Sequence, residues 1–232
     1  MIVGSGLLAR AFAPHAAQRG DVCIYAAGVS NSACADAREF AREHERLGAA
    51  LRDTAAQTLF VYFSTCSVAD PDAQASGYVR HKLAMEDMTR RHARHLILRL
   101  PQLAGDTPNP HTLLNYLYAR IVRSERFQIW AHARRNIIDV DDVARIALDL
   151  IDVEHAAGET INVANTHSSG MVEIVRTMEQ ALRHRAIFDA VERGSAYAID
   201  TQRIAAALQR CGIGFPETYL RTVIEKYYAQ RV

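Results

Sequence analysis

A tyrosine and a lysine stand four residues apart in Tyr78-Val79-Arg80-His81-Lys82, a spacing that puts both side chains on one face of a helix. The positive charge of Lys82 disfavours a protonated phenol beside it, so we expect it to lower the pKa of Tyr78. A tyrosine with a lowered pKa can exchange protons with the hydroxyl of a sugar or alcohol. The pair therefore predicts an acid/base role for Tyr78, although the same spacing also occurs on ordinary solvated helix faces.

Glycines at the start of the chain indicate a place where phosphates could bind. The segment Gly4-Ser5-Gly6-Leu7-Leu8-Ala9 has the form G-x-G-x-x-A of dinucleotide-binding loops. Glycines in such a loop let the backbone approach a pyrophosphate at the N-terminus of the next helix. Because this loop, a hydroxyl-rich segment at 63–68 and the Tyr78/Lys82 pair follow one another in this order, they predict one cofactor site.

Four later segments continue this order: Ile24-Tyr25-Ala26-Ala27-Gly28, Leu96-Ile97-Leu98-Arg99-Leu100-Pro101 with Gly105, Arg135-Asn136-Ile137-Ile138-Asp139-Val140-Asp141-Asp142-Val143-Ala144, and Ile161-Asn162-Val163-Ala164. With them the chain resembles the extended short-chain dehydrogenase/reductase superfamily, in its nucleotide-sugar epimerase, dehydratase and reductase branch. The resemblance covers nearly the whole length of the chain.

This resemblance implies an α/β fold, a Rossmann-like parallel sheet with helices on both faces and a small C-terminal substrate lobe. Residues 1–165 would form the NAD(P)-binding core, with 104–135 contributing to the lobe, and 166–232 would complete the lobe. The alternation of apolar runs with helical segments agrees with an α/β sheet. It predicts strands at 1–3, 22–27, 59–63, 95–100 and 161–164, and helices at 7–18, about 35–55, 78–94, 112–123, 140–153, 170–184, 201–211 and 218–230.

The resemblance also implies a role for each site residue. Tyr78 would exchange the proton of the reacting hydroxyl, Lys82 would hold the nicotinamide ribose, and Thr65 would hydrogen-bond the substrate oxygen. The cofactor would be NAD or NADP, and the substrate a nucleotide-activated sugar. Cofactor-binding positions are Gly4, Ser5, Gly6, Leu7, Leu8, Ala26, Ala27, Gly28, Lys82 and Pro101. Substrate-binding positions are Ser67, His111 and Arg135.

Two of the substrate positions have simpler interpretations. His111 resembles a histidine early in the lobe of epimerase-reductases, but a histidine beside a proline is often only part of a helix cap. Arg135 offers a guanidinium fork that matches the oxygens of a diphosphate. It could equally be an exposed member of the Arg134-Arg135 pair.

The residues after Thr65 narrow the reaction. Relatives that dehydrate sugars carry an Asp-Glu pair where this chain has Cys66-Ser67, and a serine cannot supply the acid/base chemistry of dehydration. Epimerase-reductases carry a cysteine at the position of Ser67, so the thiol here is displaced by one residue. If both residues continue a strand, Cys66 points away from Ser67. We therefore expect redox chemistry without proton exchange at carbon.

The N-terminal half departs from the family pattern. A dinucleotide fold places a second strand and a ribose-reading residue about 20 positions beyond the glycine loop. Here Ala26-Ala27-Gly28 already resembles the turn after the fourth strand, so the second and third strands are expected to be missing. Because the ribose-reading residue would be lost with these strands, we expect the protein to bind NAD and NADP weakly and with similar affinity. In the alternative alignment 22–27 is the true second strand, but 60–65 then follows too soon for a full sheet.

Composition excludes several other classes of protein. The 232 residues are 49% hydrophobic with a net charge of +1, which gives no nucleic-acid or membrane footprint. No apolar run approaches about 18 residues, and Met1 leads directly into the glycine loop, so we expect a cytoplasmic protein. The four cysteines show no C-x-x-C spacing, so a metal site is not expected. A homodimer formed through the helix at 78–94 is a further expectation.

The sequence thus predicts an NAD(P)-dependent oxidoreductase or epimerase acting on a nucleotide-activated sugar. The alternative is a non-catalytic Rossmann-like module for binding or assembly, with a weakened cofactor site. The joint presence of Thr65, Tyr78 and Lys82 favours the enzyme.

Overall fold

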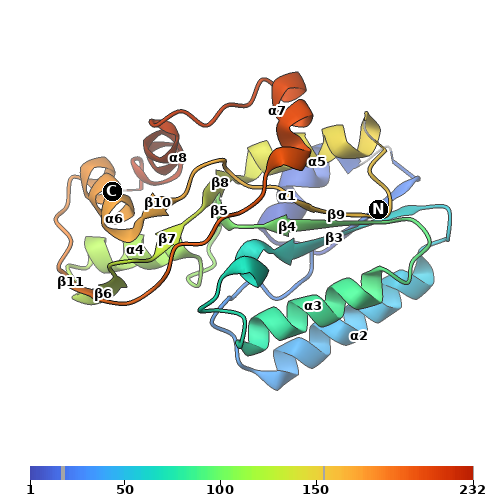
Figure 1. Cartoon of the computed structure of the whole chain (residues 1–232), viewed down its shortest axis with the longest axis horizontal. Coiled ribbons are helices and arrows are strands. Elements are labelled where there is room, and N and C mark those ends of the chain that lie inside the picture. The colour runs from blue at the N-terminus through green and yellow to red at the C-terminus, as the bar shows by residue number, and fades with distance from the viewer. Residues whose placement is uncertain (17–18, 154, 232) are drawn as a thin grey trace.

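A five-stranded parallel sheet forms the centre of the protein (Figure 1). The computed structural model describes residues 1–16, 19–153 and 155–231. The strand order is β1-β2-β3-β4-β9. The strands are β1 (Ile2–Val3), β2 (Val22–Tyr25), β3 (Leu59–Thr65), β4 (His95–Leu100) and β9 (Glu159–Asn162). All seven residues of β3 are buried, as expected for a central strand covered on both faces.

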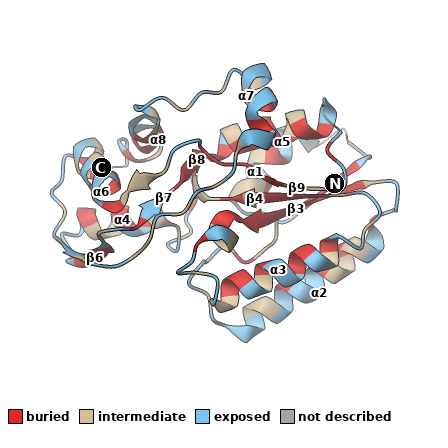
Figure 2. Ribbon diagram, viewed as in Figure 1, coloured by how far each residue is buried: buried red, intermediate tan, exposed pale blue. Residues whose placement is uncertain are grey.

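The two faces of the sheet are covered by different helices. Side chains such as Val61 and Leu98 pack with α1 (Leu7–Ala16), α5 (Val140–Asp152) and α7 (Ala205–Cys211). The alternate side chains, such as Tyr62 and Ile97, pack with α2 (Ala37–Asp53) and α3 (Gly77–Thr89). Figure 2 shows the buried sheet between helices that are exposed on their outer sides. The predicted Rossmann-like arrangement is confirmed.

The first crossover connection has an unusual hand. The connections from β1 to β2, β2 to β3 and β3 to β4 all step in the same direction across the sheet. α2 and α3 cover one face in the later two connections, whereas α1 covers the opposite face in the first. The β1–α1–β2 connection therefore has the opposite hand to the two that follow. Because parallel crossovers are right-handed in about 98% of cases, this reversal needs a cause.

The absence of the second and third family strands supplies that cause. Only residues 17–21 separate α1 from β2, too few for two strands and their connections. In the complete fold the strand order turns back at the first strand. Here α1 covers the same face of the sheet as in the complete fold, but the chain then continues directly to β2, on the side of β1 opposite to the missing strands. The alternative alignment, in which 22–27 is the second strand of the complete fold, is not supported. It would make β4 the fourth strand, which pairs with the first strand in that fold, whereas β4 pairs with β3 here.

A smaller lobe with its own core lies beside the carboxyl ends of the strands. It contains α4 (Leu113–Val122), α6 (Met171–Leu182) and α8 (Tyr219–Tyr228), which bury a second apolar cluster. Three two-stranded pairs complete it, none of them expected from the sequence. They join β5 (Gln102–Ala104) to β8 (Ile137–Asp139), β6 (Phe127–Trp130) to β11 (Phe188–Val191), and β7 (Arg134–Arg135) to β10 (Ser169–Gly170).

Most predicted elements are found within a few residues of their expected bounds. The helix expected at 78–94 ends earlier, at Thr89, and the last residues expected in the helix at 7–18 lie outside the described residues. The strand expected at 59–63 continues to Thr65, and the 3-10 helix η1 (Cys66–Ala69) follows it, so Cys66 and Ser67 do not continue the strand. Beyond 165, η2 (Gln202–Ile204) and α7 return to the core cluster, so they do not pack with the lobe to which 166–232 was assigned. No helix among the described residues is long and apolar enough to cross a membrane.

Two glycines of the N-terminal loop serve different purposes. Gly4 has a φ of +129°, and a Cβ there would lie 2.4 Å from the carbonyl oxygen of Ala26 on β2's outgoing loop. Gly6 lies at the start of α1, where a Cβ would meet nothing within 4 Å. Gly4 is thus required for the chain to pack, whereas the space at Gly6 is open to a ligand.

We predict that Gly4→Ala lowers the free energy of unfolding by roughly 2–4 kcal/mol, because it adds backbone strain and a steric clash. Gly6→Ala is the matched control and should change it by less than about 0.5 kcal/mol. Urea denaturation followed by circular dichroism measures both. Equal losses in the two variants would contradict the division of roles.

Candidate active site

A cavity of about 240 Å³ lies at the carboxyl ends of the parallel strands, between the sheet and the lobe. This is the edge where parallel α/β sheets bind ligands. Its walls come from the loops after β1 and β2, the ends of β3 and β4, α3, and the segment leading into α4. Residues expected in the site that line it are Gly6, Leu7, Leu8, Ala26, Gly28, Thr65, Ser67, Tyr78, Lys82, Pro101 and His111.

The structure brings Tyr78 and Thr65 together. Tyr78 lies in the first turn of α3, whose N-cap Ser76 accepts a hydrogen bond from the Val79 amide. The Thr65 side chain, at the end of β3, is close enough to influence the pKa of its hydroxyl, and both residues line the cavity. Thr65 is itself fixed because its Oγ1 accepts a hydrogen bond of 3.1 Å from the Ser67 amide at the start of η1. Two hydroxyls from different elements therefore face the cavity as a pair.

The pKa of Tyr78 is raised, contrary to the expectation from the Tyr78/Lys82 spacing. Burial is the main cause, because a phenolate loses its hydration there, and the neighbouring Thr65 hydroxyl offsets only part of this effect. The negative charge of Glu43 raises the pKa further. Tyr78 is therefore a proton donor at neutral pH in the protein without ligands.

Lys82 cannot act on Tyr78 as a free positive charge. Its Nζ donates to Glu43 Oε1 at 3.2 Å, to the Tyr62 hydroxyl at 3.1 Å and to the Phe63 carbonyl at 3.4 Å. These three contacts match the three donors of an ammonium group. Burial lowers the pKa of Lys82, and the charge of Glu43 opposes that change. The lysine is thus half of a buried ion pair and lies 6.0 Å from the centre of the Tyr78 ring.

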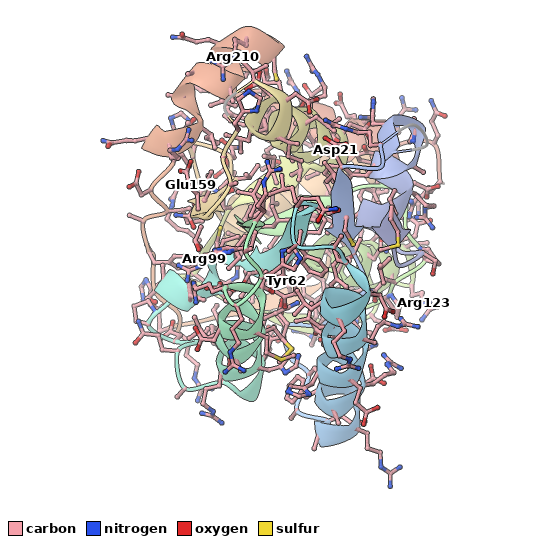
Figure 3. The ribbon with its side chains drawn as sticks, turned by 90° about the vertical axis from the view of Figure 1, so that its right-hand side faces the viewer. Asp21, Tyr62, Arg99, Arg123, Glu159 and Arg210 are labelled. Atoms are coloured by element: carbon pink, nitrogen blue, oxygen red, sulfur yellow. The ribbon has the colours of Figure 1, made fainter. Side chains whose placement is uncertain are left out.

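Glu43 of α2 connects several groups around Lys82, and no role was predicted for it from the sequence. Its carboxylate accepts hydrogen bonds from the Val29 amide at 2.6 Å and the Tyr62 hydroxyl at 2.8 Å. It also contacts His81 Nε2 at 2.9 Å. Burial alone would raise its pKa, but these partners and Lys82 outweigh it and lower the pKa to about 2. Figure 3 shows Tyr62 on the side of the sheet where α2 and α3 lie.

The position of Glu43 could have been found from helical spacing. Glu43, Leu47 and Ala50 are the buried residues of α2, and their spacing of four and three puts them on one face. A carboxylate on an otherwise apolar face requires a buried partner. In the structure that partner is Lys82, on the helix that carries Tyr78.

A second buried carboxylate supports the neighbouring strands. Glu86 of α3 accepts hydrogen bonds from the Ser64 hydroxyl at 2.6 Å and from Arg99 of β4 at 2.8 and 2.7 Å. Burial would raise the pKa of Glu86, but the bonds from Arg99 and Ser64 lower it. Arg99, labelled in Figure 3, thereby connects β4 to α3.

Cys66 and Ser67 have different surroundings. Ser67 lines the cavity, whereas Cys66 is buried away from it and its thiol donates to the Arg99 carbonyl at 3.2 Å. Burial raises the pKa of Cys66 to about 12. The two side chains diverge as expected, but the cause is the turn into η1 and not the alternation of a strand.

The lobe closes the cavity through a few polar contacts. Asn109 Nδ2 donates to the Ser30 hydroxyl at 3.0 Å, which connects the segment before α4 to the loop after β2. Both residues line the cavity. His111 also lines it, and its side chain is exposed. The N-cap of α4 is Thr112, so the capping interpretation does not account for His111.

Four expected site residues lie outside this cavity. Gly4, Ser5 and Ala27 do not line it, although their neighbours do. Arg135 instead lines a smaller hollow of about 150 Å³ in the lobe, together with Trp130. Tyr197, which the sequence did not suggest, is near enough to Arg135 and Ser67 for both to influence its pKa, which burial raises.

Across the described residues, no three histidine, cysteine, aspartate or glutamate side chains gather where they could hold an ion. Beside the cavity, Lys82 and Glu43 are paired with each other.

Residues 6–164 match the model of a protein family described as the NAD dependent epimerase/dehydratase family. No curated protein matches the chain. The match begins at Gly6, within the glycine loop, and contains Thr65, Tyr78 and the strands β2, β3, β4 and β9.

Solved structures share the fold at low sequence identity. A UDP-glucuronic acid 4-epimerase from Bacillus cereus, in complex with UDP-glucuronic acid and NAD, is 18% identical with a TM-score of 0.72, covering 91% of this chain and 76% of its own. The protein RMD from Pseudomonas aeruginosa, complexed with NADPH, is 18% identical with a TM-score of 0.68, covering 91% and 82%. A dTDP-glucose 4,6-dehydratase from Bacillus anthracis, in complex with NAD, is 14% identical with a TM-score of 0.69, covering 88% and 70%.

The ion pair predicts a specific dependence of stability on pH. Glu43 has a pKa of about 2 in the folded protein against 4.5 for a free side chain, so its stabilising effect is complete above pH 4.5 and is lost as the pH falls towards 2. We predict that Glu43→Gln lowers the free energy of unfolding at neutral pH, and that its difference from wild type shrinks by roughly 3 kcal/mol across that range. Urea denaturation at a series of pH values measures this.

Glu45→Gln is the matched control, because Glu45 is exposed on the same helix. Its difference from wild type should not vary with pH in this way. A Glu43→Gln difference that stays constant down to about pH 3 would show that the pKa of Glu43 is not lowered in the folded protein.

Proposed function

The chain belongs to the NAD dependent epimerase/dehydratase family, and from this premise we propose that it is an NAD(P)-dependent oxidoreductase or epimerase acting on a nucleotide-activated sugar. The single observation that carries the proposal is that Thr65 and Tyr78 line the same cavity close to each other. A proton donor beside a second hydroxyl is what a carbonyl or alkoxide oxygen needs as a partner.

The residues around the cavity fit the nicotinamide side of such a cofactor. A Cβ at Gly28 would lie 2.7 Å from Lys82 Nζ and 2.8 Å from Glu43 Oε1, so only a glycine leaves this wall open. The open space at Gly6 lets a phosphate approach the N-terminus of α1. Gly6, Leu7 and Leu8 would hold that phosphate, and Gly28, Lys82 and Pro101 would border the nicotinamide and its ribose. When bound, the cofactor supplies or accepts the hydride.

The raised pKa of Tyr78 supports reduction of a carbonyl over oxidation of an alcohol. A phenol that keeps its proton at neutral pH can donate it to an oxygen that gains negative charge. Thr65 would hold the same oxygen from the other side. Removal of a proton from an alcohol would first require a phenolate, which burial and Glu43 both disfavour. The protein's own groups therefore favour the reductive direction.

The surroundings of Thr65 support redox chemistry without dehydration. Ser67 is the side chain of the Cys66-Ser67 pair that faces the cavity, and it cannot act as a carboxylate would. The thiol of Cys66 is buried and stays protonated. His111 is the cavity residue that could remove a proton from carbon, and it comes from the lobe side.

Arg135 and Tyr197 would lie near the diphosphate and nucleoside parts of the substrate. Arg135 lines the smaller hollow that also contains Trp130, and its charge acts on Tyr197. A guanidinium there could bind the diphosphate of a sugar nucleotide while the sugar reaches Tyr78. The nucleoside would then lie towards the lobe, with Tyr197 close to the sugar.

A non-catalytic binding module is the competing function. The shortened sheet favours it, because a module that no longer turns over has no need of tight cofactor binding. The Thr65/Tyr78 pair and the cavity around it favour the enzyme, since a purely structural protein has no physical reason to bury two hydroxyls beside an open cavity.

We predict that Tyr78→Phe lowers turnover by about 10²–10⁴-fold, because the ring is kept and the transferable proton is lost. The wild-type protein is incubated with a panel of nucleotide sugars, with their 4-keto forms and with each cofactor, and products are identified by mass spectrometry. Tyr118→Phe is the matched control, since that hydroxyl contacts the Arg231 carbonyl far from the cavity. Wild-type rates in Tyr78→Phe would reject the acid/base role, and absence of turnover with every substrate would favour the binding module.

Proton exchange at carbon separates reduction from epimerisation. With a deuterated keto-sugar nucleotide we expect reduction without loss of deuterium to solvent, because Cys66 is protonated and outside the cavity. If exchange occurs, His111→Asn should suppress it while hydride transfer continues. Exchange that persists in His111→Asn and disappears in Cys66→Ser would contradict the placement of the thiol.

A further inference from the structure

The sheet contains one half of a dinucleotide-binding fold. The complete fold consists of two mononucleotide-binding halves that meet where the strand order reverses, so that each half receives one nucleotide. In this chain the order runs from β1 to β9 without reversal, and β1 is the outermost strand of the described sheet. The half that would receive the adenosine is reduced to β1 and α1.

The cavity reflects this reduction. Apart from the start of α1 at 6–8, every lining residue comes from β2 onward, at 25–32, 63–67, 78–82 and 100–112. Its volume of about 240 Å³ is smaller than the 300–1,000 Å³ that is typical of clefts enclosing a drug-sized molecule. A nicotinamide mononucleotide is a closer match to this space than a dinucleotide of about twice its size.

The glycine loop is open to solvent on the side where the adenosine would lie. Gly4, Ser5 and Gly6 are exposed, and β1 consists of two residues without a partner strand on its outer edge among the described residues. α1 has no acidic side chain in its first turn, so its positive N-terminal end remains available to one phosphate. Beyond that phosphate, the described residues provide no further strand against which an adenine or its ribose could rest.

We infer that this protein binds the nicotinamide mononucleotide half of its cofactor and leaves the adenosine half in solvent. The inference rests on the proposed function, since it assumes that a nicotinamide cofactor enters the cavity beside Tyr78. Contacts from Gly28, Pro101 and the α1 N-terminus then provide the binding free energy. The adenosine, with or without a 2′-phosphate, contributes little because it meets no protein surface.

The experiment compares four probes by calorimetry on the purified full chain. Reduced nicotinamide mononucleotide, NADH and NADPH should bind with dissociation constants within about tenfold of one another. ADP-ribose, which carries the adenosine half without nicotinamide, should bind at least about tenfold more weakly than any of them. NADH bound more than about a hundredfold more tightly than the mononucleotide would overturn the inference and leave the proposed function intact. Failure of all nicotinamide probes to bind at millimolar concentration would overturn both.

A pair of variants tests the placement of the phosphate. Gly6→Asp introduces a negative charge at the start of α1, where a Cβ meets nothing within 4 Å, so the fold should tolerate it. It should weaken the mononucleotide and NADH by the same factor, at least about fivefold, through like-charge repulsion. Gly20→Asp is the matched control, since a Cβ there also meets nothing within 4 Å and Gly20 does not line the cavity. Unchanged binding in Gly6→Asp, or an effect on NADH alone, would overturn the inference.

Discussion

The buried charge pair of Glu43 and Lys82 constrains the whole catalytic corner. Both side chains are almost fully buried between the sheet and helices α2 and α3, where an isolated charge would be very costly. They are tolerated because each is surrounded by partners: Tyr62 from β3, the Val29 amide from the loop after β2, and His81 from α3. The sheet, the loop after β2 and the helices α2 and α3 must therefore all be in place before the charges are compensated. The position of Tyr78 is a consequence, since it lies one helical turn before Lys82.

Because Glu43 neutralises the charge of Lys82, the lysine no longer lowers the pKa of Tyr78. An uncompensated ammonium near the ring would favour the phenolate, whereas an ion pair exerts little net field at that distance. Burial and the residual effect of Glu43 then hold the pKa of Tyr78 above its usual value. The site at rest is consequently prepared to give a proton.

Loss of strands from one side of β1 leaves the other side of the site intact. Parallel strands deliver their carboxyl ends to one edge, and the residues that carry the proposed chemistry come from β3, β4 and α3, on the retained side. The reversed hand of the β1–α1–β2 connection is a consequence of this loss, because α1 still covers the face it would cover in the complete fold. Its interaction with α5 explains why it remains there: the core cluster that contains Phe12 would otherwise be open to water.

The sequence by itself determined the elements, their order and the pairing of Tyr78 with Lys82 on one helix, because hydrophobic periodicity and four-residue spacing are local properties. It also determined that two strands were missing, since 22–28 follows the glycine loop too closely. Only the tertiary structure decided that Glu43 neutralises Lys82, that Arg135 faces a separate hollow, and that Gly4 serves packing while Gly6 leaves open space. These depend on groups that other elements bring within a few ångströms. Spacing along the chain carries no information about such distances, nor about the burial that sets a pKa.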